Sequence, residues 1–474
     1  MTKPTLTSAG NRRDWLLPVL CLFTVTFFIY RDFDIRMLYG YALLALILGV
    51  HVLRRLWLDR APAVDPLRMA LLLLAAAVLV NFLRPDSRHN SDTISFIISM
   101  VICCGFVLLS RPTERIGRFA LGLCFGCALF TTAFIFFFEE NPWYFWNWFM
   151  MKLSTTAANY TAYYVPKGYS FTLGGCTQTD YTLFLGLAVC CGYAVCRGKP
   201  DWKSGLAALF GGLFFYGILI VGRRGELLGA AICLMLLVLA LCNKKQRRFL
   251  IVAGIIACVV GFAAVVALMP WLKQIPALHR YVWTVEWMLK GYDVTSGRTE
   301  LYALAWNAFL DNPIFGLGWD MFHSAIPESF QDAHGQNLVE DVHNIYLQFL
   351  CETGIVGTPF LVAPLFYIYW LVCRQFSRLK NNAHPTARLF CIVSFMLQSF
   401  LLVMGLFDPT FQKIVFWCFY GIAVLLQCTA LELEGHTPDD SLSRWLRKLI
   451  HLCAPPFVLV WNWVAGLFAC LRRT

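Results

Sequence analysis

The residues best suited to chemistry lie at the start of a hydrophobic stretch, in the segment EDVHNIYLQFLCETGIVG over residues 340–357. His343 stands at the entrance to that stretch. A neutral imidazole near pH 7 is a good general base for a hydroxyl group. Glu340, Asp341 and Asn344 are close enough along the chain to orient the ring. The alternative is a histidine with a purely structural role at the start of a helix.

Two adjacent arginines form a second group of residues that could take part in chemistry. Arg223 and Arg224 lie in IVGRRGELLGA, residues 220–230, at a tight junction between two apolar stretches. The planar fork of a guanidinium group binds phosphate through paired hydrogen bonds, and two such forks suit a pyrophosphate. The alternative is that both arginines extend to lipid headgroups, with Glu226 as their ionic partner.

A third arginine, Arg298, follows a glycine in TSGRTELY, residues 295–302. It falls in the first turn of a predicted helix, where backbone N–H groups already favour an anion. The alternative is a surface arginine in a loop.

An acidic and basic turn, YRDFDIR over residues 30–36, has the Asp-x-Asp spacing of a divalent metal site, but an Asp–Arg network that fixes the turn is the favoured interpretation. The sequence contains no HExxH motif, no paired CxxC and no P-loop. Zinc hydrolysis and ATP use therefore have no support, and neither a metal nor a cofactor is expected.

The elements that position these residues are membrane helices. The chain has 474 residues, of which 59% are hydrophobic and 14% charged, against about 25% charged in soluble domains. Its mean hydropathy is +0.62. Apolar runs long enough to cross a bilayer recur along the whole chain, so the sequence predicts an all-α polytopic membrane protein. Twelve spans are expected, at 15–30, 37–53, 67–83, 93–109, 117–138, 181–196, 205–222, 225–242, 249–269, 345–373, 388–407 and 413–430.

The orientation of the spans follows from the distribution of Lys and Arg, because cytoplasmic segments carry the positive excess. With both termini cytoplasmic, the inside segments hold 26 of the 39 basic residues and the outside segments 13. The net charge of +11 is therefore a topological signal and does not indicate nucleic-acid binding. Arg31 and Arg84 are expected on the same external face as His343 and the other three arginines.

Two external loops are long. Residues 139–180 form the smaller loop between spans in the first part of the chain, 1–269. Residues 270–344 form a large helical loop between spans nine and ten, with an amphipathic helix over 277–290 at the membrane and a second helix that begins near Arg298 and ends at Asn312-Pro313. Spans ten to twelve fill 345–430. The tail, 431–474, is expected to be cytoplasmic, and its 449–470 run either lies on the membrane or crosses it.

Three of these motifs, in chain order, resemble the signature of the bacterial O-antigen ligase and polymerase superfamily. They are GRRGELLG, SGRTELYALAWNAFLDNPIFGLGW and HNIYLQFLCETGIVG, which together cover roughly residues 220–360. The twelve spans and the long loop between spans nine and ten are most similar to the ligase branch. The resemblance implies a GT-C-like glycosyltransferase fold, with the active site at the periplasmic face of the bacterial inner membrane.

The resemblance also implies roles for individual residues. The histidine of the HN motif falls on His343, the expected catalytic base, and the SGR arginine falls on Arg298. The short-turn arginine falls on Arg223 or Arg224, and the register between the two stays open. No motif assigns Arg31 or Arg84, which are included as pyrophosphate-binding residues only because of their expected face.

The implied reaction transfers a polysaccharide from undecaprenyl pyrophosphate to a sugar hydroxyl of lipid A–core, with inversion and without a metal. The expected partners are these two lipid-linked substrates and membrane lipids, and no nucleic acid. An O-antigen polymerase, which joins two lipid-linked glycans, is the first alternative, and a protein O-oligosaccharyltransferase is the second. A transporter of a lipid-linked anion would also need arginines, but it would not require His343 beside a folded external loop.

Overall fold

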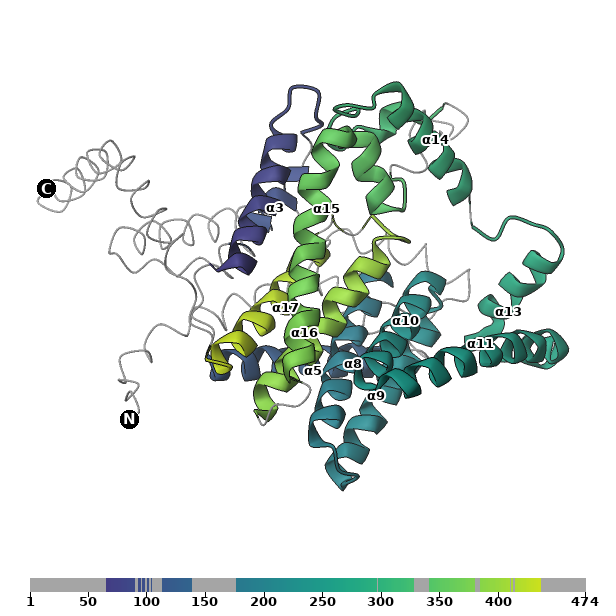
Figure 1. Ribbon diagram of the computed structural model, residues 1–474. Helices are drawn as coiled ribbons and strands as arrows, with labels where there is room; N and C mark the ends of the chain where they lie inside the picture. Colours follow the sequence, from purple (N-terminus) through teal and green to yellow (C-terminus); the bar gives the residue numbers. More distant parts are fainter. Residues whose placement is uncertain are drawn as a thin grey trace, which may run out of the picture.

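The computed structural model describes residues 65–89, parts of 93–104, 113–138, 176–327, 341–379 and 384–435, with short gaps at 296 and near 411. Every regular element among these residues is a helix (Figure 1). The helices are α3 (Pro66–Phe82), α5 (Glu114–Phe138), α8 (Cys176–Arg197), α9 (Trp202–Val221), α10 (Arg224–Leu241), α11 (Lys244–Ala267), α12 (Met269–Leu272), α13 (Pro276–Leu289), α14 (Arg298–Asp311), η3 (Phe322–Ala325), α15 (Ile345–Leu379), α16 (Pro385–Met404) and α17 (Ile414–Leu433).

The all-α polytopic membrane class is confirmed. Among the described residues, seven helices are long and apolar enough to cross a membrane, and α3 and the end of α17 are shorter apolar helices. Nine of the twelve predicted spans coincide with described helices, whereas 15–30 and 37–53 lie outside the described residues and 93–109 is described only in part. The total of twelve, the orientation and the domain limits remain predictions, and so does the behaviour of the tail beyond residue 435. One boundary was wrong: α8 begins at Cys176, so 176–180 belong to a helix and not to the preceding loop.

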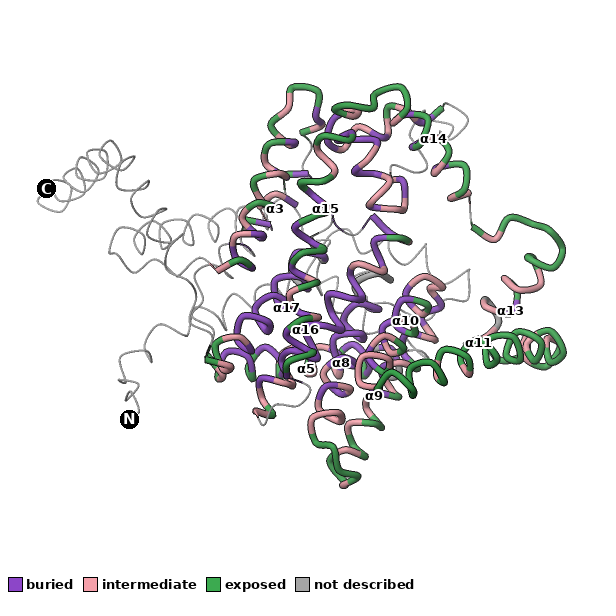
Figure 2. The backbone as a smooth tube through the Cα atoms, viewed as in Figure 1, coloured by how far each residue is buried: buried purple, intermediate pink, exposed green. Residues whose placement is uncertain are grey.

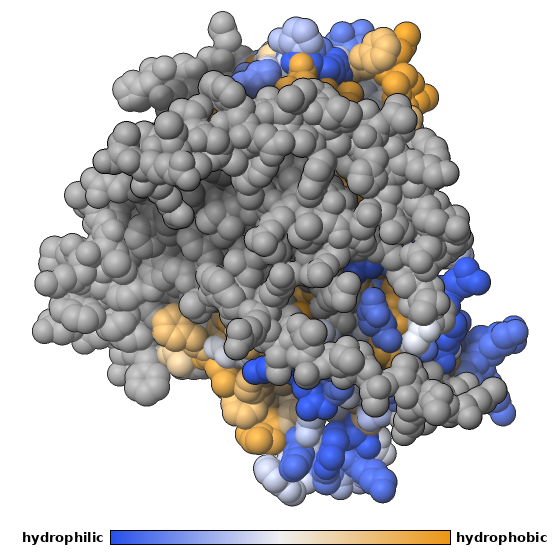
Figure 3. All heavy atoms as spheres, turned by 90° about the vertical axis from the view of Figure 1, so that its left-hand side faces the viewer, coloured by the Kyte–Doolittle hydropathy of each residue, from blue (hydrophilic) through white to orange (hydrophobic). Residues whose placement is uncertain are grey.

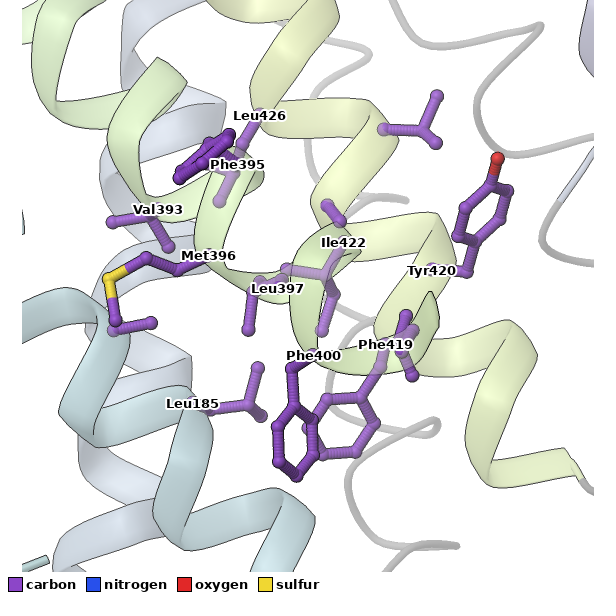
Figure 4. Close-up of a cluster of buried hydrophobic side chains, with 14 of the residues drawn as sticks. Leu185, Val393, Phe395, Met396, Leu397, Phe400, Phe419, Tyr420, Ile422 and Leu426 are labelled. Carbon is purple, nitrogen blue, oxygen red and sulfur yellow. The ribbon is translucent and has the colours of Figure 1, made fainter. Parts of the chain in front are cut away.

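The core is a bundle in which α8, α9, α16 and α17 pack most closely, with α5, α10 and α15 around them (Figure 2). Leu185 of α8, Phe400 of α16 and Phe419 of α17 meet in its interior (Figure 4). Gln398 donates to Gln427 over 2.9 Å across α16 and α17. Hydrogen bonds between helices of this kind hold membrane bundles together where lipid and side chains are equally apolar. Hydrophilic residues among those described gather toward the upper and lower ends of the molecule (Figure 3).

Helix α11 stands apart from this bundle (Figure 1). None of its residues is buried, and its contacts are with α12 and α13 (Figure 2). An apolar helix in lipid loses nothing by this exposure, because lipid tails solvate its side chains as well as protein would. The segment that starts at α12, which the sequence predicts to be external, is thus connected to the bundle through a helix with an exposed apolar surface.

The predicted span 345–373 is two helical limbs joined by a kink. Gly354 has φ +64° and ψ −170° inside α15, a backbone conformation that ends an α-helix. Figure 1 shows α15 turning over at its upper end, with a short first limb and a long second limb. The sequence predicted one continuous span over 345–373, without a break at this glycine.

A Gly-rich loop satisfies the backbone groups that the kink exposes. The Leu317 and Gly318 N–H groups donate to the carbonyls of Cys351 and Glu352, both over 2.9 Å. From the other side of the kink, Ile355 donates to the Pro313 carbonyl over 2.9 Å. Buried backbone groups need hydrogen-bond partners, and these bonds supply them at the kink, so the helix can break there without leaving polar groups unsatisfied. The NPIFGLG and ETGIVG motifs therefore interlock.

Replacing Gly316 by alanine is expected to loosen this interlock. Gly316 has φ +70°, and a Cβ atom there would lie 2.5 Å from the Glu352 oxygen. Strain of this kind is expected to lower the free energy of unfolding by about 2 kcal/mol or more. Thermal unfolding of the purified protein in detergent measures the effect. The control is Gly122→Ala in α5, where a Cβ meets nothing within 4 Å, and equal melting temperatures for both variants would contradict the interlock.

Candidate active site

Arg223 lies in the tight turn between α9 and α10. Gly222 makes the turn possible because it adopts φ +77° at the end of α9. The Arg223 Nε is 2.8 Å from Glu226 Oε1, and its Nη2 is 3.3 Å from Asp408 Oδ2 at the end of α16. Glu226 and Asp408 are only 2% and 1% exposed. Arg223 is thus held by buried carboxylates of the protein, rather than extending only toward lipid headgroups.

Arg224 points to the large external loop. Its Nη1 donates to Thr284 Oγ1 of α13 over 3.2 Å and to the Val294 carbonyl over 2.9 Å. The two adjacent arginines therefore have different surroundings, which the sequence alone left open. Arg223 belongs to the carboxylate cluster, and Arg224 fastens the loop to the turn.

Replacing Arg224 by lysine is expected to raise the rate of proteolysis within residues 291–297 about tenfold, because a single ammonium group does not reproduce the fork that joins Thr284 and Val294. The measurement is limited proteolysis of the purified protein. Arg247→Lys is the control, since Arg247 also donates to a backbone carbonyl, that of Leu239. An unchanged rate of proteolysis would show that Arg224 does not fasten this loop.

Arg298 opens α14, as the sequence predicted. Gly297 precedes it with φ +79°, and its N–H donates to Asp293 Oδ2 over 2.8 Å. A hydrogen bond from the Thr295 hydroxyl holds the pKa of the Asp293 carboxyl below its ordinary value, so this loop stays anchored at neutral pH. Arg298 acts electrostatically on Glu226. Within the described residues its guanidinium makes no hydrogen bond or ion pair, so its donors remain available for an anion.

His343 adopts a backbone conformation that is rare for residues other than glycine. Its φ is +58°, in the left-handed region. Strained backbone of this kind persists where the surroundings enforce it, and it gathers at functional sites. The observation supports a functional role for His343.

Tyr302 of α14 connects His343 to the rest of the site. Its hydroxyl lies 3.5 Å from the carbonyls of both His343 and Leu406. Burial raises the pKa of the Tyr302 phenol, so the hydroxyl keeps its proton at neutral pH. Two residues after His343, the Ile345 N–H donates to the Gly405 carbonyl over 2.8 Å. The turn at 405–408, which supplies Asp408 to Arg223, therefore also borders the histidine segment.

The predicted orienting residues have separate positions. Asn344 Oδ1 accepts the N–H groups of Tyr346 and Leu347, each over 3.1 Å, and so caps the first limb of α15. The sequence had not predicted this capping role for Asn344. Asp341 is half-buried beside the histidine, and Glu340 lies outside the described residues. Whether either acid orients the imidazole remains a prediction.

Arg84 lies at the α15 kink. It pairs with Asp86, and its Nη1 donates to the Phe315 carbonyl in the Gly-rich loop over 2.5 Å. This placement gives Arg84 a structural function that the sequence did not suggest. Its role with pyrophosphate stays untested, and Arg31 lies outside the described residues.

Several residues of the site were not predicted as functional from the sequence. Glu226 was considered only as an ionic partner, and Asp408 and Tyr302 were not considered. A carboxylate at the boundary of an apolar span was the available signal, because buried charge in a membrane protein is costly and rarely accidental. Asp408 stands at such a boundary, after the end of α16.

These features define a class: a helical membrane protein with guanidinium groups and a strained histidine at one end of its bundle. Such a site suits chemistry on an anionic lipid-linked substrate. Residues 209–362 match the family model described as O-antigen ligase, and this match supports membership of the O-antigen ligase superfamily. The matched segment includes Arg223, Arg224, Arg298 and His343. No curated protein matches the chain.

Proposed function

We propose that this protein is an O-antigen ligase that transfers a polysaccharide from undecaprenyl pyrophosphate to a sugar hydroxyl of lipid A–core. Membership of the superfamily and the membrane helices support the general activity, that of a glycosyltransferase-like enzyme with lipid-linked glycan substrates. The observation that carries the proposal is the convergence of three segments distant in sequence: the 222–224 turn, the start of α14 and the entrance of α15. Their connections run through Asp408 and Tyr302.

In the proposed mechanism, His343 accepts the proton of the acceptor hydroxyl. The hydroxyl oxygen then bonds to the anomeric carbon from the side opposite the leaving group, which inverts that carbon. The bond from carbon to the pyrophosphate oxygen breaks, and the electron pair stays on pyrophosphate. Arg223, Arg224 and Arg298 stabilise the charge that develops there, since fixed cations act most strongly on charge that appears in the transition state.

The proposed setting is the bacterial inner membrane, with the site facing the periplasm. The donor and the acceptor would both reach the site from the outer leaflet. The guanidinium groups are proposed to serve without a metal or another cofactor, because they supply the positive charge that the leaving group needs.

Reconstitution with two acceptors tests the proposal. The purified protein in vesicles receives a lipid-linked glycan donor together with either lipid A–core or a second lipid-linked glycan. Product on lipid A–core alone is expected. Product only on the lipid-linked glycan would instead identify a polymerase, and no glycosidic product with either acceptor, despite donor binding, would favour a transporter.

A further inference from the structure

Helix α14 carries an exposed tryptophan close to the candidate active site. Trp306 is 48% exposed, although Ala305 and Ala308 on the same helix are buried. Its ring centroid lies 5.4 Å from that of Phe309, and the two rings are tilted by 47°. An aromatic side chain contributes most when it is covered, so an exposed ring beside a second ring indicates a surface that contacts another molecule.

The exposed side of α14 is not built for lipid chains. Glu300, Asn307 and Asp311 are exposed on this helix, and α14 is not one of the helices long and apolar enough to cross a membrane. The apolar helix α11, in contrast, has no charged residue from Phe249 to Ala267. The mixture of aromatic and polar groups on α14 suits a ligand that presents both C–H and hydroxyl groups.

One side of α14 connects Trp306 to the candidate active site. Arg298, Tyr302 and Trp306 are spaced four residues apart, so they lie along one side of the helix, each about 6 Å further along its axis. The Tyr302 hydroxyl lies 3.5 Å from the His343 carbonyl. The buried face of α14 packs in one cluster with Val342, the residue before His343. The helix therefore presents, in order, a guanidinium group, the histidine segment and the exposed indole.

This order matches the order of groups in the proposed reaction. Inversion requires that the leaving pyrophosphate and the attacking hydroxyl lie on opposite sides of the anomeric carbon. Arg298 is proposed to bind the pyrophosphate, and His343 is proposed to accept the proton of the hydroxyl. The sugar that carries this hydroxyl should then lie beyond His343 as seen from Arg298, which is the side on which Trp306 stands.

The chemistry of an indole ring fits such a sugar. The faces of a pyranose ring carry C–H groups with small positive partial charges, whereas the face of an aromatic ring carries the negative part of its quadrupole. A tryptophan also offers a large, rigid contact area at a low cost in conformational entropy. We propose that Trp306, supported by Phe309, is a binding residue that stacks on the acceptor sugar of the core oligosaccharide. This inference rests on the proposed function, because the acceptor is identified there.

Two replacements of Trp306 test the inference. Trp306→Leu keeps an apolar side chain but has no aromatic face, so the KM for lipid A–core is expected to rise about fivefold to tenfold. The KM for the lipid-linked donor and kcat should change less than about twofold, because neither the pyrophosphate site nor the base is altered. Trp306→Tyr keeps an aromatic face and should stay within about threefold of the original KM for lipid A–core. An unchanged acceptor KM in Trp306→Leu, or an equal rise in the donor KM, would overturn the inference.

A soluble competitor separates contact with sugar from contact with lipid. Core oligosaccharide freed of lipid A should inhibit transfer to lipid A–core, and its inhibition constant should rise about fivefold to tenfold in Trp306→Leu. An unchanged inhibition constant would mean that Trp306 contacts lipid, and the inference would be wrong. Trp202→Leu is the matched control, because Trp202 is 73% exposed and begins α9 at the end opposite to Arg223. Its KM values should equal those of the original protein.

The original protein and Trp306→Leu together show which proposal fails. If the original protein transfers no glycan to lipid A–core, the proposed function has failed. If the original protein transfers glycan normally and the acceptor KM is the same in Trp306→Leu, the proposed function stands and this inference has failed.

Discussion

Replacement of His343 by alanine is expected to reduce glycan transfer at least about 100-fold while the protein still inserts and folds. A general base contributes about 100- to 10,000-fold, and the acceptor hydroxyl is a weak nucleophile until its proton is removed. The measurement is transfer by the purified variant to lipid A–core. Near-normal transfer would contradict the assignment of His343 as the base.

The backbone at His343 requires additional variants. Because its φ is +58°, alanine introduces strain that is unrelated to the loss of the imidazole. Asparagine tolerates the left-handed region, and glycine adopts it freely. His343→Asn and His343→Gly should therefore be as inactive as His343→Ala but more stable. Added imidazole should partly restore transfer by His343→Gly, because the vacated space accepts the free base.

A second histidine of the same loop serves as the control. His323 lies in η3, and its Nδ1 is 3.0 Å from the Asp320 carbonyl. None of its described contacts is with Arg223, Arg224 or Arg298. His323→Ala should retain transfer within a fewfold of the original protein. A loss equal to that of His343→Ala would indicate that the loop responds to any histidine replacement, and the chemical role of His343 would then lack support.

Replacement of Arg223 by glutamine is expected to affect both activity and stability. Removal of a cation that stabilises a leaving group lowers the rate by about 100- to 1,000-fold. Glu226 and Asp408 would also remain buried without their cation, and breaking a buried ion pair on one side costs about 3–5 kcal/mol. Transfer assays and thermal unfolding measure the two effects separately.

A double variant distinguishes the chemical role of Arg223 from the structural one. In Arg223→Gln with Glu226→Gln, one uncompensated charge is removed, so much of the lost thermal stability should return. Transfer should stay low, because no guanidinium group has been restored. Recovery of transfer along with stability would show that Arg223 serves the fold alone and does not bind the donor.

Much of the helical framework could be predicted from local sequence. Apolar runs of bilayer length gave the membrane class, and helical periodicity gave the helices that the structure places at Pro276–Leu289 and Arg298–Asp311. The break at Gly354 could not be predicted, because glycine is tolerated within membrane helices and the partners of the exposed backbone groups lie far away in the sequence. What permits the break is a set of hydrogen bonds from Pro313–Gly318, about 40 residues earlier in the chain.

For the candidate site, too, the sequence determined one part and the tertiary structure another. The motifs around Arg223, Arg298 and His343 carry recognisable residue types, so the sequence by itself determined which groups to consider, and these residues lie in the segment that matches the O-antigen ligase family model. Only the tertiary structure distinguished Arg223, held by Glu226 and Asp408, from Arg224, held by the loop. It alone also revealed Asp408 as a partner of Arg223. The physical reason is that hydropathy and periodicity report the solvent around each segment, whereas ion pairs and burial depend on which distant segments meet.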